Sequence, residues 1–148
     1  MTIIVILILC GLVIMSVAIH LSVLRFLIHF VRRMRFFPIL GMGISMFAAI
    51  LGHLFEIWIF SLAIMQMCND KRFGSFANEV QLTKSDYFYY SSLSYTSLGF
   101  GDIAPEGALR ALAAVEAITG LVLIAWTASF AFLAMQELWA TKSHEPQL

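Results

Sequence analysis

Two glycines at alternate positions, Gly99 and Gly101, are the residues whose type and spacing point most directly to chemistry. A cation that leaves water needs oxygen atoms to replace its hydration shell, and backbone carbonyls facing one axis supply them. Successive carbonyls point the same way only when alternate residues take unusual dihedral angles, some with positive φ, which glycine adopts without steric cost. Ser97 adds a hydroxyl at one end of the run. We therefore predict a cation-coordinating strand here.

The side chains that alternate with the two glycines are expected to point away from the coordinating carbonyls. Leu98 and Phe100 would then lie against the short helix that precedes the strand. Asp102 follows the strand, at its outer end. We expect its carboxylate to brace the strand by a hydrogen bond to that helix, or to attract cations, while a solvated loop acid is the plainer alternative.

The composition determines what kind of elements can hold such a strand. Hydrophobic residues make up 61% of the 148 residues and charged residues 12%, whereas soluble domains carry about 25% charged residues. Long apolar runs cover residues 1–24, 36–67 and 108–140, and each is long enough to cross a membrane. The first lacks a positive start and is too long for a cleaved signal peptide, so we expect a retained helix. The fold class is therefore all-α membrane, with three transmembrane helices.

The segment of residues 85–95 is helical in character but too short to span a membrane. Ser85 and Asp86 are typical of a helix start, and the glycines that follow residue 98 end the helix. Irregular backbone at membrane depth is tolerated only where it lines a watery path or is buried in protein. We therefore predict a re-entrant pore helix and loop, with the negative end of the helix dipole facing the ion path.

Charge placement predicts the orientation, and the net charge and the lack of a catalytic set argue against two classes of function. Arg25, Arg32, Arg33 and Arg35 cluster between the first two apolar runs, and such short basic loops stay in the cytoplasm. The N-terminus is then outside the cell and the C-terminus is cytoplasmic. The formal net charge is zero, so no nucleic-acid partner is expected. No nucleophile, base and acid set is apparent, so we predict that the protein is not an enzyme and needs no cofactor.

Three acidic or imidazole side chains within the second and third apolar runs are candidates for a role. His53 and Glu56 share one helix face and form an intramembrane polar pair. Helix packing is the simpler interpretation, and a pH-sensing or gating role is the alternative, because ionisable groups inside a membrane are costly. Glu116 is expected behind the predicted strand, as a hydrogen-bonded and protonated acid that stabilises the pore helix rather than as an ion ligand.

The last apolar run carries the candidates for a gate. Gly120 is either a bending point or a site of close helix packing, since glycine serves the second purpose often in membranes. Ile124, Ala128 and Phe132 recur at every fourth position, so they share one face. That face either lines a cavity, with Phe132 as a hydrophobic constriction, or is a plain packing stripe.

The run Thr96-Ser97-Leu98-Gly99-Phe100-Gly101-Asp102 resembles the potassium-channel signature Thr-Val-Gly-Tyr-Gly-Asp. The chain is similar, over residues 38–140, to the small bacterial two-helix potassium-channel-like family, with one extra N-terminal helix. The resemblance implies three parts: an N-terminal helix and basic turn (residues 1–35), a pore domain (36–140) and a short cytoplasmic tail (141–148). It also implies a multi-pass protein of the bacterial inner membrane.

The resemblance further implies a potassium-selective homotetramer embedded in lipid, with potassium as the permeant ion. Potassium would be held at Ser97, Leu98, Gly99 and Phe100, and Tyr89 and Tyr90 would take the place of the family's paired tryptophans. The sequence has Ser, Leu and Phe where the family usually has Thr, Val and Tyr. Those departures leave a weakly selective cation channel as one alternative, and a non-conducting subunit of a larger assembly as another.

Overall fold

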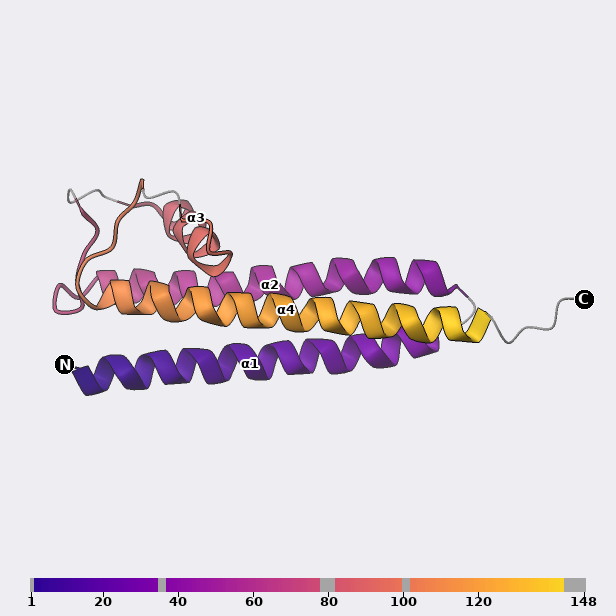
Figure 1. The fold of residues 1–148 in the computed structure, drawn as a ribbon. Coiled ribbons are helices and arrows are strands. Elements are labelled where there is room, and N and C mark those ends of the chain that lie inside the picture. The colour runs from indigo at the N-terminus through magenta and orange to yellow at the C-terminus, as the bar shows by residue number, and fades with distance from the viewer. Residues whose placement is uncertain (1, 35–36, 78–81, 100–101, 143–148) are drawn as a thin grey trace, which may run out of the picture.

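The computed structural model describes residues 2–34, 37–77, 82–99 and 102–142. Within them the chain forms four helices, which are α1 (Thr2–Arg33), α2 (Pro38–Cys68), α3 (Lys84–Tyr95) and α4 (Ala108–Lys142). The three long helices run lengthwise beside one another, and the short α3 lies against one end of α2 and α4 (Figure 1). The element order is therefore a long helix, a second long helix, a half-length helix and a third long helix.

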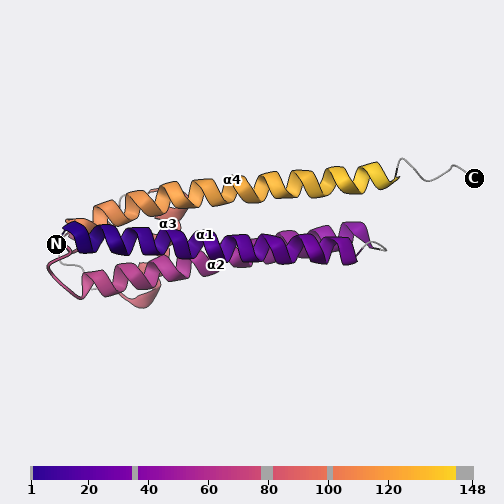
Figure 2. The ribbon, with the colours of Figure 1, turned by 90° about the horizontal axis from the view of Figure 1, so that it is seen from below.

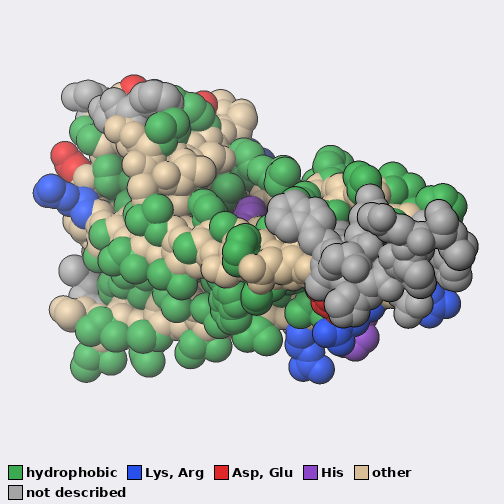
Figure 3. All heavy atoms as spheres, turned by 45° about the vertical axis from the view of Figure 1, so that its right-hand side comes forward, with side chains coloured by type: hydrophobic (Ala, Val, Ile, Leu, Met, Phe, Trp, Pro, Cys, Tyr) green, Lys and Arg blue, Asp and Glu red, His purple; other side chains and the backbone are tan. Residues whose placement is uncertain are grey.

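The three long helices confirm the predicted membrane architecture. Each is long and apolar enough to cross a membrane, and α1 packs against both α2 and α4 (Figure 2). Figure 3 shows hydrophobic side chains over most of the visible flank, with Lys and Arg side chains gathered toward the two ends. Ile39 is 80% exposed and Ile3 74% exposed, which suits a surface solvated by lipid.

Local sequence explains where α2 and α3 begin. Pro38 occupies the first turn of α2, where its missing N–H leaves no hydrogen bond unmade. The expected start of α3 at Ser85 and Asp86 is wrong by one residue, because Thr83 is the N-cap and α3 begins at Lys84. Thr83 and Asp86 form a reciprocal capping box, which satisfies two backbone N–H groups at once. The Thr83 backbone N–H and hydroxyl both donate to the Asp86 carboxylate and hold the pKa of that group below its ordinary value.

The loops on either side of α3 tie that helix to the bundle. The chain that leaves α2 pairs with the chain that enters α4 through an isolated antiparallel bridge between Phe76 and Pro105. Backbone hydrogen bonds flank the bridge, from Ala77 N to Ala104 O at 2.9 Å and from Glu106 N to Ser75 O at 2.8 Å. The two segments therefore hold each other close to the start of α4.

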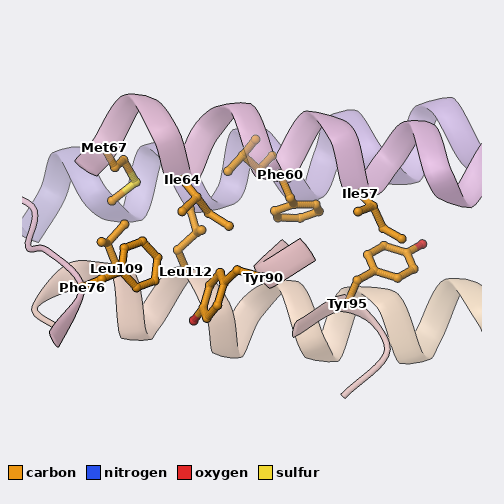
Figure 4. Packing of buried hydrophobic residues seen from close by; sticks show 10 residues of the cluster. Ile57, Phe60, Ile64, Met67, Phe76, Tyr90, Tyr95, Leu109 and Leu112 are labelled. Carbon is orange, nitrogen blue, oxygen red and sulfur yellow. The ribbon is translucent and has the colours of Figure 1, made fainter. Parts of the chain in front are cut away.

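The main buried cluster lies between α2 and the facing sides of α3 and α4 (Figure 4). Phe60, Ile64, Tyr95 and Leu112 are each fully buried. Phe76 adds an edge-to-face contact with the Tyr90 ring at 4.9 Å. In lipid this cluster is stabilised by close packing rather than by the removal of apolar area from water. Its effect is to fix α3 at a set depth and angle beside α4.

Candidate functional site

The backbone that leaves α3 has the alternation that a coordinating strand requires. Ser97 has φ +58° and Gly99 has φ +50°, so two alternate residues lie in the left-handed region. The N–H groups of Leu98 and Gly99 both donate to the Leu93 carbonyl, at 2.9 and 3.4 Å, and so hold the first part of the strand against the end of α3. The positive φ was expected at a glycine, and that of Ser97 was not. Phe100 and Gly101 lie outside the described residues.

The side chains at the start of the strand do not all point as expected. Thr96 donates its hydroxyl to the Ser92 carbonyl at 2.7 Å, which occupies it within α3. Leu98 is 60% exposed, so the expectation that it lies against the preceding helix is wrong within one chain.

Tyr89 and Tyr90 have different partners although they are adjacent. The Tyr89 hydroxyl donates to Asp102 Oδ2 at 3.4 Å, a long hydrogen bond that joins α3 to the far side of the strand. Tyr90 is buried against Phe76 in the main cluster instead. Of the two tyrosines, Tyr89 therefore contacts Asp102, and Tyr90 anchors α3.

Glu116 is fully buried and contacts Ser91 of α3. Ser91 Oγ is 2.8 Å from the Ile57 carbonyl and 2.5 Å from Glu116 Oε1. A serine hydroxyl has one hydrogen to donate, and the Ile57 carbonyl has none and can act only as an acceptor. With Ser91 donating to Ile57, the second contact is made by a protonated Glu116 that donates to Ser91 Oγ. The other carboxyl oxygen has no hydrogen-bond partner among the described residues, which also suits a neutral acid in an apolar site.

This arrangement predicts how Glu116 tolerates substitution. Glu116→Gln should retain wild-type thermal stability in detergent, because a neutral amide can also donate to Ser91. Glu116→Leu, of similar volume, should lose about 0.5–1.5 kcal/mol, the usual net contribution of one hydrogen bond. Thermal unfolding of the purified variants measures both. Equal destabilisation by Gln and Leu would show that Glu116 acts as a carboxylate rather than as a neutral donor.

Gly120 is a site of close packing. A Cβ atom at this position would lie 2.1 Å from the Tyr95 carbonyl oxygen and 2.9 Å from the carbonyl carbon. The absence of a side chain therefore lets α4 pass directly beneath the end of α3. α4 continues as one helix from Ala108 to Lys142, with Gly120 in its interior.

The remaining gate candidates lie on the surface of the single chain. Ile124 is 40% exposed and Phe132 60% exposed, and Ala128 between them is also exposed. None of the three is buried by α1 or α2. This face of α4 is therefore available either to line a cavity or to meet another subunit.

The polar pair predicted on α2 belongs to a larger cluster. Glu56 Oε1 lies 3.0 Å from His20 Nδ1 of α1, and Glu56 Oε2 accepts a hydrogen bond from the Tyr95 hydroxyl. His53 lies 2.9 Å from that hydroxyl and 3.0 Å from Thr127 Oγ1 of α4. The cluster therefore joins all four helices at the C-terminal end of α3.

Sequence reasoning missed three members of this cluster and one further residue, which contacts Glu116. They are His20, Tyr95, Thr127 and Ser91. A signal for the first was present, because His20 is the one histidine in an apolar run of 24 residues, where polar groups are costly. The others are ordinary residue types whose partners lie 25 to 107 positions away along the chain, so spacing could not have identified them.

Comparison with known proteins agrees with this geometry. Residues 53–137, more than half of the chain, match the family model described as ion channel. No curated protein and no solved structure gives a significant match. The matched part covers the half of α2 that contacts α3, the whole of α3, the strand and most of α4, whereas α1 lies outside it. The short helix α3, the segment after it with positive φ at Ser97 and Gly99, and the family match together place this chain in the two-helix ion channel family.

Proposed function

We propose that four copies of this chain form a potassium-selective channel. One chain supplies one strand, and a ring of carbonyls around a cation needs several, which a closed cyclic homotetramer provides. Potassium ions would be coordinated at Ser97, Leu98, Gly99 and Phe100, with Thr96 and Gly101 completing the selectivity filter. The protein then conducts passively and changes no covalent bond.

The observation that carries this proposal is the alternation of positive φ at Ser97 and Gly99, directly after a helix too short to span a membrane. The left-handed Ser97 also ends α3 in a common way, with the Leu98 N–H donating to the Leu93 carbonyl, but that helix end does not require the second left-handed residue at Gly99. Successive carbonyls can share one direction under this alternation. Tyr89 supports the proposal by linking α3 to Asp102 across the strand.

The exposed face of α4 completes the pore in this proposal. Ile124, Ala128 and Phe132 would line a cavity on the cytoplasmic side of the filter, where the negative end of the α3 dipole faces the ion. Phe132 would form the narrowest apolar point. Gly120 would keep α4 close beneath the filter rather than act as a hinge.

We propose the orientation from the basic residues at the turn between α1 and α2. Arg25, Arg32 and Arg33 are exposed there, and Arg32 lies 3.8 Å from Glu137 of α4. A short basic turn stays in the cytoplasm. The filter then opens outward, and the N-terminus of α1 and the loops around α3 lie outside the cell or in the periplasm.

Selectivity is tested by recording from the purified protein in planar bilayers, with potassium chloride on one side and sodium chloride on the other. We expect the current to reverse close to the potassium equilibrium potential, because a carbonyl-lined filter replaces the hydration shell of potassium. Native mass spectrometry of the same preparation should give a tetramer. Reversal near zero with robust current would replace this proposal with a weakly selective cation channel.

The serine at position 97 is the specific observation behind that second candidate. The chain has Ser97 with φ +58° at the inner end of the filter, and a serine lacks the methyl group that stiffens threonine at χ1. A softer inner site discriminates less between cations of different size. Absence of current from a folded tetramer at every pH and potential would instead favour a non-conducting subunit.

A further inference from the structure

A closed ring of five hydrogen-bond contacts joins the four helices near the middle of α1, α2 and α4, and His53 Nδ1 also lies at a longer distance of 3.4 Å from Glu56 Oε2. His20 Nδ1 meets Glu56 Oε1 at 3.0 Å, and His20 Nε2 meets Thr127 Oγ1 at 3.2 Å. Thr127 Oγ1 also meets His53 Nε2 at 3.0 Å, and His53 Nδ1 meets the Tyr95 hydroxyl at 2.9 Å. The Tyr95 hydroxyl and Glu56 Oε2 form the fifth contact. We call these five residues the histidine cluster.

The hydrogens that the histidine cluster carries can be counted. Each neutral imidazole has one N–H, Thr127 and Tyr95 have one O–H each, and an ionised Glu56 has none. Four hydrogens are then available for five contacts, each of which needs one. When both imidazoles are neutral and Glu56 is ionised, every arrangement of the hydrogens leaves one contact with two lone pairs facing each other.

We propose that the histidine cluster is a proton-binding site, which holds one proton beyond the neutral forms of His20 and His53 as an imidazolium paired with the Glu56 carboxylate. With the added proton on His53, both of its nitrogens donate, to Tyr95 and to Thr127, and Thr127 donates to His20. With the added proton on His20, Thr127 donates to His53 instead. All five contacts are satisfied in both arrangements. The proton passes from one ring to the other when His53 Nε2 gives its hydrogen to Thr127 Oγ1 while Thr127 gives its own hydrogen to His20 Nε2, which leaves the new hydroxyl directed at His53.

Burial favours this charge state. The side chains of His20 and Glu56 are 3% and 0% exposed and that of His53 is 14% exposed, so an unpaired carboxylate here would carry a large desolvation cost. One bound proton makes the cluster neutral overall. A divalent metal ion at the same atoms would leave a net positive charge in an apolar site, so a proton is the better match. An imidazole also ordinarily binds a proton more tightly than a carboxylate does.

The position of the cluster links the proton to the filter. Tyr95 is the last residue of α3, and its carbonyl packs on Gly120 one residue before the filter begins. His20 comes from α1, which lies outside the matched family region. The titratable groups that meet in the cluster are His20, His53, Glu56 and Tyr95, and Glu116 of α4 lies near Tyr95 as a neutral acid. Loss of the proton as the pH rises removes one contact, adds a negative charge and loosens α1 from the end of α3.

Nitrogen NMR of ¹⁵N-histidine-labelled protein in liposomes tests the proposal without reference to conduction. The full chain carrying His29→Gln and His144→Gln leaves only the two cluster histidines. At about pH 8, where a free imidazole has lost its added proton, we expect one imidazolium and one neutral imidazole. Two neutral imidazoles at this pH would overturn the proposal.

Two variants make the test specific. Glu56→Gln has nearly the same shape but brings two amide hydrogens and no charge, so six hydrogens serve five contacts and the imidazolium signal should disappear. Thr127→Val removes two contacts and one hydrogen, leaving three hydrogens for three contacts, and should also abolish it. An imidazolium that persists in both variants would mean that the cluster geometry does not hold the proton. Because the variants change different helices, failure of one to fold leaves the other as the test.

Thermal unfolding of the unsubstituted protein and of Glu56→Gln separates a proton site from a merely structural cluster. The thermal unfolding midpoint of the protein with Glu56 should fall as the pH rises from about 6 to about 10, since the bound proton stabilises the folded state. That of Glu56→Gln should change much less over the same range. Parallel pH profiles of the two proteins would contradict the proposal.

Discussion

Gly99→Ala is expected to abolish potassium current while leaving the tetramer assembled. Gly99 has φ +50°, a conformation that costs an L-residue about 1–2 kcal/mol. Each of the four proposed filter strands would carry that cost, so the conducting arrangement becomes less favourable by roughly 4–8 kcal/mol per channel. Since every 1.4 kcal/mol is a factor of ten, the conducting population should fall on the order of a thousandfold or more. Bilayer recording with matched protein amounts measures the loss.

Gly43→Ala is the matched control for this change. Gly43 lies within α2, and a Cβ atom there would meet nothing within 4 Å. The same methyl group is added, without positive φ and without a clash, so current should stay at the level of the unchanged protein. If Gly99→Ala conducts as well as Gly43→Ala, the backbone at Ser97 and Gly99 does not line the ion path.

Gly120→Ala is expected to destabilise the folded protein and to disturb the filter. The added Cβ would lie 2.1 Å from the Tyr95 carbonyl oxygen, which is backbone and cannot rotate away. Overpacking of this kind costs about 1–3 kcal/mol per site, and more where backbone must shift. The end of α3 would move away from α4, and the Tyr95 hydroxyl would move from Glu56 with it. The thermal unfolding midpoint and the bilayer current should therefore both decrease.

Gly11→Ala controls for the change in helix propensity. Gly11 lies in α1 with nothing within 4 Å of a Cβ atom, and the change from glycine to alanine favours a helix by a similar amount at both positions. Any difference between the two variants therefore reports the clash at Tyr95. If Gly120→Ala keeps its stability and changes only channel opening, then Gly120 is a hinge and the packing interpretation is wrong.

Local sequence determined most of the architecture. Three long apolar runs predict three spans because a membrane requires about 20 apolar residues for each, and the structure has all three helices. Pro38 predicts where α2 starts, since its backbone preference acts on its immediate neighbours, whereas α3 ends before the glycines, at a left-handed Ser97 that residue type did not predict. The potassium-channel-like signature lies in one short run, so the family was also accessible from the sequence.

Only the tertiary structure decided which distant residues meet. His20 and Thr127 are 107 positions apart and share a hydrogen bond, and no periodicity within α1 or α4 predicts it. The choice between hinge and packing site at Gly120 likewise depends on Tyr95, which approaches from another helix. Spacing within a helix shows which residues share a face, but the partner of that face depends on how the helices pack. The candidate filter could therefore be proposed from its own residues, whereas the histidine cluster could be identified only from the packed helices.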